Sequence, residues 1–527
     1  MAARVRFPGR GLCYIDTSEP IPRAVKRRGF FAPGNLKMSV QIFLLGKLSG
    51  LEDFLLSPVA GESGSVSAAG NASPVEGAAG VLAGRAQWAA LLTEVLPRGI
   101  LAELGLSPLL LGTSGGGQFL VVLPEESKGR AEEILSAARA DIHARSAGRL
   151  RLVWASTENL GDWPIVRKRL YAALNKALGT PLAVKLGGAA AEQDFGQFAE
   201  GFREAGTASW SASAPGLVAV EGGTHTWRLG PGPDDIHLAR HTALNEAGTH
   251  PATPAELAER AEGSQRWGVL RGDVDNFGVR LRNCADIEEH LRLSRLMKGF
   301  FAGEIELACN ALPELWRKAT ILYTGGDDFA VYGSWDALIR LAREFHRLFE
   351  LFAGENLRQW DGPEAKTISM ALALAPDQDT PFPYVYEEAG RLLESAKSED
   401  KDCFQLFGRT VDWKQVYRAA DLREGLIRLV KDFRCPPGFL TELTGFYREK
   451  TQAGTGGESR APGGRPWRYH RRIGRALGSR TGREFEKLRH AVTQELVGGS
   501  AQHVRLRPAG RVAVEWARLS IEAETNV

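Results

Sequence analysis

The chain has 527 residues, of which 43% are hydrophobic and 24% charged, so its composition excludes disorder throughout and its length requires about three or four domains. The formal net charge of +3 gives no global argument for a nucleic-acid partner, which would have to bind a local patch. The five cysteines never form a CxxC motif and no run of 18 or more apolar residues occurs, so the sequence excludes a disulfide scaffold, predicts no membrane span and indicates a cytoplasmic protein.

The first part of the chain predicts an N-terminal extension followed by one α/β block. Residues 1–38 are rich in Arg, Pro and Gly and show no sustained period. After a predicted strand at 39–46, a Gly-, Ala- and Ser-rich tract at 60–83 is typical of a mobile loop. The block then continues with a helix at 84–104, a hairpin with arms at 108–113 and 119–124, a helix at 125–146, a strand at 150–155 and a helix at 163–178.

A second block repeats this order after residues 180–262, whose weak periodicity indicates a linker or a small irregular domain. Its predicted elements are a strand at 267–274, a helix at 286–310, a hairpin with arms at 319–324 and 329–334, a helix at 336–354, a strand at 367–375, a helix at 384–398 and a short strand at 403–407. Strand, helix, hairpin, helix, strand is the βαββαβ ferredoxin-like plan. The sequence therefore predicts an α+β protein with two ferredoxin-like domains.

The C-terminal part, from about residue 412, is mostly helical in pattern, with a Gly-rich gap at 453–464. Residues 460–490 hold ten Lys and Arg against two Glu, which indicates either a solvated helix face or a surface for an RNA backbone or an acidic neighbouring subunit. The predicted division is an extension at 1–38, a first domain at 39–180, a linker region at 181–262, a second domain at 263–410 and a basic helical domain at 411–527.

Carboxylates end two neighbouring elements of the second block. Strand 267–274 runs into Asp273 and Asp275, and the hairpin tip is Gly-Gly followed by Asp327 and Asp328. In the ferredoxin-like plan the first strand lies beside the hairpin, so Asp273 is expected about one strand spacing of ~4.8 Å from the tip. Such carboxylates repel one another unless a divalent cation lies between them, and hard oxygen ligands favour Mg²⁺ or Mn²⁺. All four are predicted metal ligands, although Asp275 could instead cap the turn.

The hairpin tip also suits a nucleotide. Gly325 and Gly326 would permit φ > 0 and let a triphosphate approach the backbone, and two metal ions could clamp an attacking oxygen and an α-phosphate. GGDD alone is also an ordinary turn sequence, but its coupling to the upstream Asp-Val-Asp favours a site. Lys397 and Lys401 either complement the dipole of helix 384–398 or reach the β- and γ-phosphates.

This set of motifs resembles the large palm-domain subunit of type III CRISPR effector complexes, which is similar to the palms of diguanylate cyclases and polymerases. The resemblance covers most of residues 39–410. The matching segments are GDVDNFG at 272–278, LSRLMKGFFAG at 293–303, LYTGGDDFAVYG at 322–333 and ESAKSEDKDCFQLFG at 394–408, with LSGLEDFLL at 48–56 and SGGGQFLVVLP at 114–124 in the first block.

The resemblance implies two palm domains that convert ATP into 3′–5′ cyclic oligoadenylates with the help of two Mg²⁺ or Mn²⁺ ions. It implies other CRISPR effector subunits, crRNA and target RNA as partners. Asp273, Asp327 and Asp328 would be the catalytic metal ligands. Nucleotide contacts would come from Gly325, Gly326, Asn276, Phe277, Lys397 and Lys401 in the second palm and from Ser114, Gly115, Gly116 and Gly117 in the first.

The sequence also departs from the family pattern. Lys47 stands in the first block where the second has Asp273, and Gly117-Gln118 stands where the second has Asp327-Asp328, so the first palm would be degenerate and hold the acceptor ATP. No His-Asp dipeptide occurs, so no HD-type nuclease activity is expected of this chain. The alternatives are a catalytically silent scaffold subunit of the same ribonucleoprotein and a GTP-using cyclase of the GGDEF type.

Overall fold

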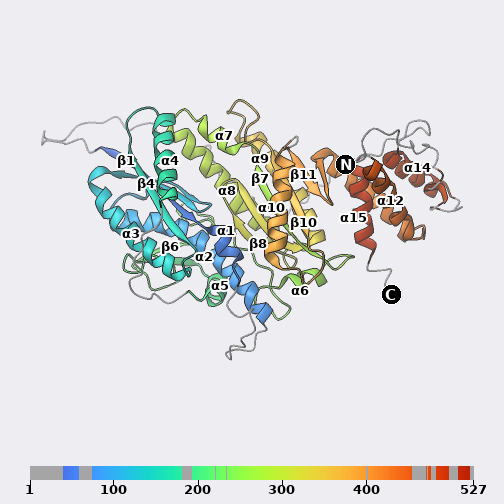
Figure 1. Cartoon of the computed structure of the whole chain (residues 1–527), viewed down its shortest axis with the longest axis horizontal. Coiled ribbons are helices and arrows are strands. Elements are labelled where there is room, and N and C mark those ends of the chain that lie inside the picture. Colours follow the sequence, from blue (N-terminus) through green and yellow to red (C-terminus); the bar gives the residue numbers. More distant parts are fainter. Residues whose placement is uncertain are drawn as a thin grey trace.

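The computed structural model describes residues 40–58, 74–180, 193–219, 221–232, 234–398, 401–453, 471, 473–475, 477, 482–497 and 508–522. The predicted N-terminal extension at 1–38 lies outside these residues. Two sheet-containing units lie side by side, and a group of C-terminal helices lies at one end (Figure 1). Within the described residues, no helix is both long enough and apolar enough to cross a bilayer.

The first unit is built on a four-stranded sheet with the order β2-β3-β1-β4. Its strands are β1 (Gln41–Ser49), β2 (Leu111–Gly115), β3 (Gln118–Pro124) and β4 (Arg151–Glu158), and β1 pairs antiparallel with both β3 and β4. The helices of this unit are α1 (Leu51–Leu56), α2 (Pro74–Glu103), α3 (Lys128–Arg145) and α4 (Trp163–Gly179), with short 3₁₀ turns η1 (Pro108–Leu110) and η2 (Glu125–Ser127). Residues 108–110, predicted as strand, form the η1 turn.

Strand β1 is apolar along most of its length because it is covered on both faces. Successive side chains of a strand point to opposite sides of the sheet. Phe43 packs against Trp163 of α4, with ring centroids 5.2 Å apart, whereas Leu44 enters the core that contains Trp88 of α2. Both faces of the sheet are therefore covered at β1, the central strand that carries Lys47 near its end.

The second unit is a six-stranded sheet with the order β12-β11-β10-β7-β9-β8. Its strands are β7 (Trp267–Val274), β8 (Ala319–Thr324), β9 (Asp328–Ser334), β10 (Ile368–Leu374), β11 (Cys403–Leu406) and β12 (Arg409–Asp412). Its helices are α7 (Phe277–Arg282), α8 (Ile287–Ala311), α9 (Trp335–Asn356) and α10 (Phe382–Ser398). The first four strands follow the βαββαβ order, and β11, added after α10, runs parallel to β10. Phe329 of β9 faces the α8 and α9 side, whereas the neighbouring Ala330 shares the core on the α10 side.

Helix α2 begins ten residues before the predicted helix, so the prediction of a loop up to residue 83 is wrong for residues 74–83. The rest of that tract, 59–73, lies outside the described residues. Glycines at the start of α2, inside and just after that tract, allow helix α5 (Phe195–Arg203) to approach α2 closely. A Cβ atom added at Gly80 would lie 3.8 Å from Cα of Gly196, and one added at Gly84 would lie 1.8 Å from the carbonyl oxygen of Phe195. Here glycine is needed for close helix packing.

The predicted linker region at 181–262 contains regular structure. Beyond α5, it holds the hairpin of β5 (Thr207–Trp210) and β6 (His225–Arg228) and the short helix α6 (Pro254–Glu259). Thr253 and Glu256 form a reciprocal capping box at the start of α6. The segment is irregular in pattern because its elements are short and because it packs on neighbouring elements rather than around its own core, as α5 does on α2 and Trp210 does against Gly99 of α2.

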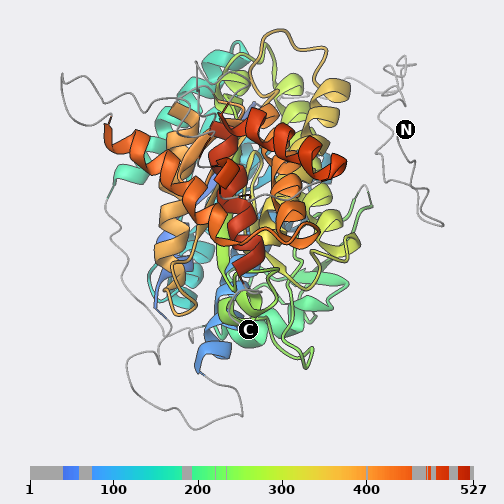
Figure 2. The ribbon, with the colours of Figure 1, turned by 90° about the vertical axis from the view of Figure 1, so that its right-hand side faces the viewer.

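The C-terminal helices are α11 (Trp413–Lys431), α12 (Gly438–Ala453), α14 (Arg483–Val497) and α15 (Pro508–Ile521), which cross one another in front of the second sheet in Figure 2. Arg423 of α11 lies over the ring of Trp516 in α15 at 5.2 Å. Of the basic residues at 460–490, the structure describes Arg471, Arg475, Arg483, Lys487 and Arg489. Both interpretations of this stretch stay predictions.

Candidate active site

The carboxylates predicted to form the site lie where β7 ends and β9 begins. In the antiparallel β7–β9 ladder, Asp273 is directly opposite Asp328. The backbone N–H of Val274 donates to the carbonyl oxygen of Asp327 at 2.9 Å, which fixes the turn against the end of β7. The structure therefore brings Asp273, Asp327 and Asp328 to one edge of the sheet. The corresponding positions of the first sheet carry Lys47 opposite Gln118, as the comparison of the two blocks predicts.

Burial and mutual repulsion disfavour the charged forms of these acids. Burial, together with the Asp328 and Asp273 carboxylates, raises the pKa of Asp327 to about 7, and burial, together with Asp273, raises the pKa of Asp328 to about 6. Burial also raises the pKa of Asp273, although its carboxylate lies 2.9 Å from the Lys397 ammonium group. Lys397 lies in the last turn of α10, as the dipole interpretation predicts, and its ammonium group also pairs with Asp273 of this cluster. Its contact with phosphates stays a prediction.

The donor chemistry of the cluster fits a divalent cation, because carboxylate oxygens are the preferred ligands of Mg²⁺ and Mn²⁺ and because a cation would relieve the repulsion that raises these pKa values. In the part of the chain that the structure describes, no three or more His, Cys, Asp or Glu side chains are already arranged as a metal site. Asp273, Asp327 and Asp328 are the residues that would hold a cation at this edge of the sheet.

Asp327→Asn is expected to stabilise the metal-free protein at pH 8. The raised pKa means that the folded state binds the Asp327 proton more tightly than the unfolded state does. The free energy of unfolding therefore falls as pH rises from about 4 to about 7. The substitution removes this loss, which is on the order of 2 kcal/mol after solvent screening. In EDTA the variant should unfold at a higher temperature than wild type at pH 8 and at the same temperature at pH 4. Mg²⁺ should raise the midpoint of wild type more than that of the variant; equal midpoints at both pH values would contradict the assignment.

Asp275 has a different environment from the other three acids. Its side chain is buried, Oδ2 accepts hydrogen bonds from the Thr367 hydroxyl at 2.8 Å and from the backbone N–H of Asp402 at 3.0 Å, and Oδ1 accepts one from the Ser369 hydroxyl at 2.8 Å. A carboxylate whose two oxygens are satisfied in this way holds neighbouring strands together. The geometry favours a structural role for Asp275 over the predicted role of metal ligand.

Asp275→Ala is accordingly expected to destabilise the fold by about 2 kcal/mol, because it leaves the buried Ser369 hydroxyl and two half-buried donors, the Thr367 hydroxyl and the Asp402 N–H, without their acceptor. Urea unfolding should show this loss, while Asp361→Ala, which removes an exposed aspartate of the same unit, should change stability by less than about 0.5 kcal/mol. Equal stability of the two variants would return Asp275 to the set of candidate metal ligands.

The residues that follow Asp275 are also engaged within the protein. Asn276 has φ of 60° and starts α7, and its side-chain oxygen accepts a hydrogen bond from the ammonium group of Lys401. Phe277 is 6% exposed and belongs to the hydrophobic core. The predicted nucleotide contact of Phe277 is not supported, because its ring packs inside the second unit, and Lys401 in this structure holds the loop after β7.

The two glycines at the hairpin tip do not use positive φ, so this part of the prediction is wrong. Gly325 is required for a different reason, since an added Cβ would lie 1.9 Å from Oδ1 of Asp328. A Cβ at Gly326 would meet no atom within 4 Å. The tip of the first sheet approaches at this point, and a Cβ added at Gly116 would lie 3.3 Å from the backbone nitrogen of Gly326. The two hairpin tips therefore touch.

A pocket of about 400 Å³ opens beside the carboxylates. It is lined by residues of β7, β8, β9, α10 and α1, including Asp273, Asp328, Arg271, Tyr323, Tyr386 and Glu52. The guanidinium group of Arg271 lies 4.4 Å from the centre of the Tyr386 ring and 3.6 Å from the Glu52 carboxylate of the first unit. Sequence reasoning missed Arg271, although its position two residues before Asp273 places it on the same face of β7.

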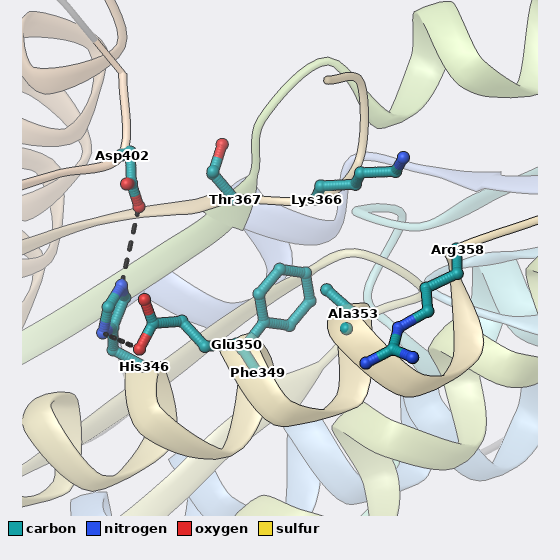
Figure 3. Close-up of a pocket in the computed structure, with 9 residues that line it drawn as sticks. His346, Phe349, Glu350, Ala353, Arg358, Lys366, Thr367 and Asp402 are labelled. Carbon is teal, nitrogen blue, oxygen red and sulfur yellow. Dashed lines mark ion pairs between the residues drawn. The ribbon is translucent and has the colours of Figure 1, made fainter. Parts of the chain in front are cut away.

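A second pocket of about 320 Å³ is lined by residues of α9 together with Lys366, Thr367 and Asp402 (Figure 3). In the figure, His346 lies between Glu350 and Asp402, and Arg358 and Lys366 lie at the opposite end. This pocket shares Thr367 and Asp402 with the hydrogen bonds of Asp275 but is not lined by Asp273, Asp327 or Asp328. Asp273 and Asp328 therefore line the first pocket and not the second.

Comparison with known proteins identifies the unit that holds these carboxylates. Residues 266–405 match the second palm domain of the Cas10/Cmr2 family. The second unit is therefore similar to the second palm domain of Cas10 proteins. It is 29% identical over 172 residues to the type III-A Cas10/Csm1 single-strand-specific deoxyribonuclease of Thermococcus onnurineus, and 31% identical over 183 residues to that of Mycobacterium tuberculosis. Each match covers about a third of this chain (30% and 31%) and 21% of the relative.

Solved structures of Cas10/Csm1 proteins share the fold over nearly the whole chain. The Csm1–Csm4 subcomplex of a type III-A interference complex matches with a TM-score of 0.66 at 17% identity and covers 92% of this chain and 70% of the other. A Csm1–Csm4 cassette in complex with cA3 matches with a TM-score of 0.64 over 93% of this chain and 71% of the other, and a cassette with one ATP with 0.64 over 91% and 70%. At this identity the similarity establishes the fold.

Proposed function

We propose that this chain is the nucleotidyltransferase subunit of a type III CRISPR effector complex, and that it converts ATP into 3′–5′ cyclic oligoadenylates when target RNA is bound. The observation that carries the proposal is Asp273 opposite Asp328 at an open pocket, with Asp327 adjacent. Similarity to Cas10/Csm1 chains crystallised with ATP and with cyclic oligoadenylates supports it. Other effector subunits, crRNA and target RNA are the proposed partners, and the cytoplasm is the proposed site of action.

In this proposal Asp273, Asp327 and Asp328 would hold two divalent ions, which would supply Lewis-acid polarisation of the attacking 3′-hydroxyl and of the donor α-phosphate. The chain itself supplies position. The Gly325–Gly326 backbone lies where a triphosphate can approach, and Lys397, already 2.9 Å from Asp273, is within reach of its phosphates. The 3′-oxygen of the acceptor attacks the donor α-phosphorus, the bond to the β-phosphate oxygen breaks, and pyrophosphate leaves.

The first unit is the proposed acceptor side and a degenerate palm. Lys47 opposite Gln118 offers no carboxylate for a metal, yet its tip at Ser114–Gly117 touches the tip at Gly325–Gly326. With the two tips in contact, an acceptor nucleotide bound to one unit would lie beside a donor bound to the other. The proposed donor role of the second unit and acceptor role of the first unit rest on this difference in carboxylates.

Incubation of the reconstituted complex with labelled ATP or GTP, with Mg²⁺ or Mn²⁺ and with or without cognate RNA, tests the proposal. Mass spectrometry should find cyclic oligoadenylates from ATP only when RNA is present. A cyclic dinucleotide from GTP would instead identify a GGDEF-type cyclase. No turnover of either nucleotide with either metal would identify a scaffold subunit.

A further inference from the structure

Four polar side chains meet in a buried contact where the two units join. Glu94, in the middle of α2, has a fully buried side chain. Its Oε1 accepts a hydrogen bond from the Lys298 ammonium group of α8 at 2.6 Å, and its Oε2 accepts one from Arg98 at 2.7 Å and one from the Ser114 hydroxyl at 2.8 Å. Lys298 also donates to the Ser114 hydroxyl oxygen at 3.1 Å. Lys298 belongs to the second unit, and the other three residues belong to the first.

Burying these charged groups carries a desolvation penalty. Burial alone would raise the pKa of Glu94, but Lys298 and Arg98 hold this pKa below its usual value, so two cations stabilise the Glu94 anion. A buried ion pair is often no more stabilising than apolar residues of the same size, so a gain in stability does not explain it. The contact instead fixes geometry, because its hydrogen bonds join α2 of the first unit and α8 of the second unit to the β2–β3 hairpin.

That hairpin is the one that touches the catalytic tip. Ser114 lies at the end of β2, and a Cβ added at the next residue, Gly115, would lie 3.3 Å from Oε1 of Glu94 and 3.6 Å from Cε of Lys298. The following residue, Gly116, is the one in contact with Gly326. The chain of contacts therefore runs from Lys298 through Glu94 and Ser114 to the point where the two tips meet.

We propose that Lys298, Glu94 and Ser114 form a latch that fixes the Ser114–Gly117 tip against the Gly325–Gly326 tip and so sets the separation between acceptor and donor nucleotides. The inference rests on the proposed nucleotidyl transfer. It makes Lys298 a positioning residue of the reaction and gives the Ser114 hydroxyl, predicted as a nucleotide contact, the role of holding the tip.

The matched variants are Lys298→Met and Lys318→Met in the reconstituted complex. Lys318 forms a comparably buried ion pair with Asp336 at 2.9 Å, but at the end of β8 away from the tip. Lys298→Met leaves Glu94 paired with Arg98, so the carboxylate keeps a cation and the fold is expected to hold. A tip displaced by about 1 Å should lower kcat about 10- to 100-fold with little change in KM for ATP. Lys318→Met should leave both constants near wild type, and Lys298→Arg should recover part of the rate.

Hydrogen exchange at residues 114–117 provides a readout that does not depend on activity. Faster exchange there in Lys298→Met, but not in Lys318→Met, is the expected result, and it would stand even if wild type made no product and the proposed function failed. Unchanged exchange in Lys298→Met, or equal losses of kcat in the two variants, would overturn the latch. An increase in KM without a decrease in kcat would overturn it too, since Lys298 would then bind the nucleotide directly.

Discussion

Asp327→Ala combined with Asp328→Ala is expected to lower RNA-dependent synthesis of oligoadenylate by at least about 10³-fold while the complex still assembles. These two residues lie with Asp273 at the edge of the second sheet, and the double substitution removes two of the three carboxylates that are proposed to hold the divalent ions. A metal ion contributes several kcal/mol to the stabilisation of phosphoryl transition states, which corresponds to a loss of this size.

The measurement is the initial rate of product formation at saturating ATP and metal, with RNA binding and subunit composition measured in parallel. Glu132→Ala combined with Glu133→Ala, a neighbouring acid pair on α3 of the first unit, is the matched control and should keep the wild-type rate. Turnover at the wild-type rate in the Asp327/Asp328 variant would place the chemistry elsewhere in the complex. Loss of assembly in that variant alone would show instead that the two acids are structural.

The proximity of Asp273 to Asp327 and Asp328 could be predicted from the sequence, because this proximity depends only on the order of the strands. Once residues 267–274 and the 319–334 hairpin are recognised as neighbours, the pairing of Asp273 with the tip follows from the period of a strand. The same argument predicted Lys47 opposite Gln118. Predictions of this kind need only the order of elements and the residue at each strand end.

Contacts between residues that are distant in sequence were beyond such reasoning. Glu94 and Lys298 are separated by 204 positions, and nothing in either helix pattern marks them as partners. Asp275 resembled a metal ligand by its position after the strand, but Thr367 and Ser369 occupy its oxygens from β10 and the preceding loop. The small residues of 74–83 resembled a loop because their partner, α5, lies more than 100 residues further along the chain. Tertiary packing decided each of these cases.

The two tip glycines should respond very differently to alanine. In Gly325→Ala the new Cβ would lie 1.9 Å from Oδ1 of Asp328, so the carboxylate has to turn away from its place opposite Asp273. The displaced atom is the end of a side chain, so the fold should lose little stability. The rate should fall by about 100-fold or more, because a catalytic group displaced by about 1 Å can cost that much. Higher metal concentrations should recover part of it.

Gly326→Ala is the matched comparison, since its Cβ would meet no atom of the protein within 4 Å. If the backbone here contacts a triphosphate, the added methyl group should raise KM for ATP with a smaller effect on kcat, whereas Gly325→Ala should lower kcat. Steady-state kinetics of both variants, with thermal unfolding as a check on the fold, separates the two effects. Wild-type constants in Gly326→Ala would mean that the nucleotide does not approach this backbone. A wild-type rate in Gly325→Ala would mean that catalysis does not need Asp328 in the position that faces Asp273.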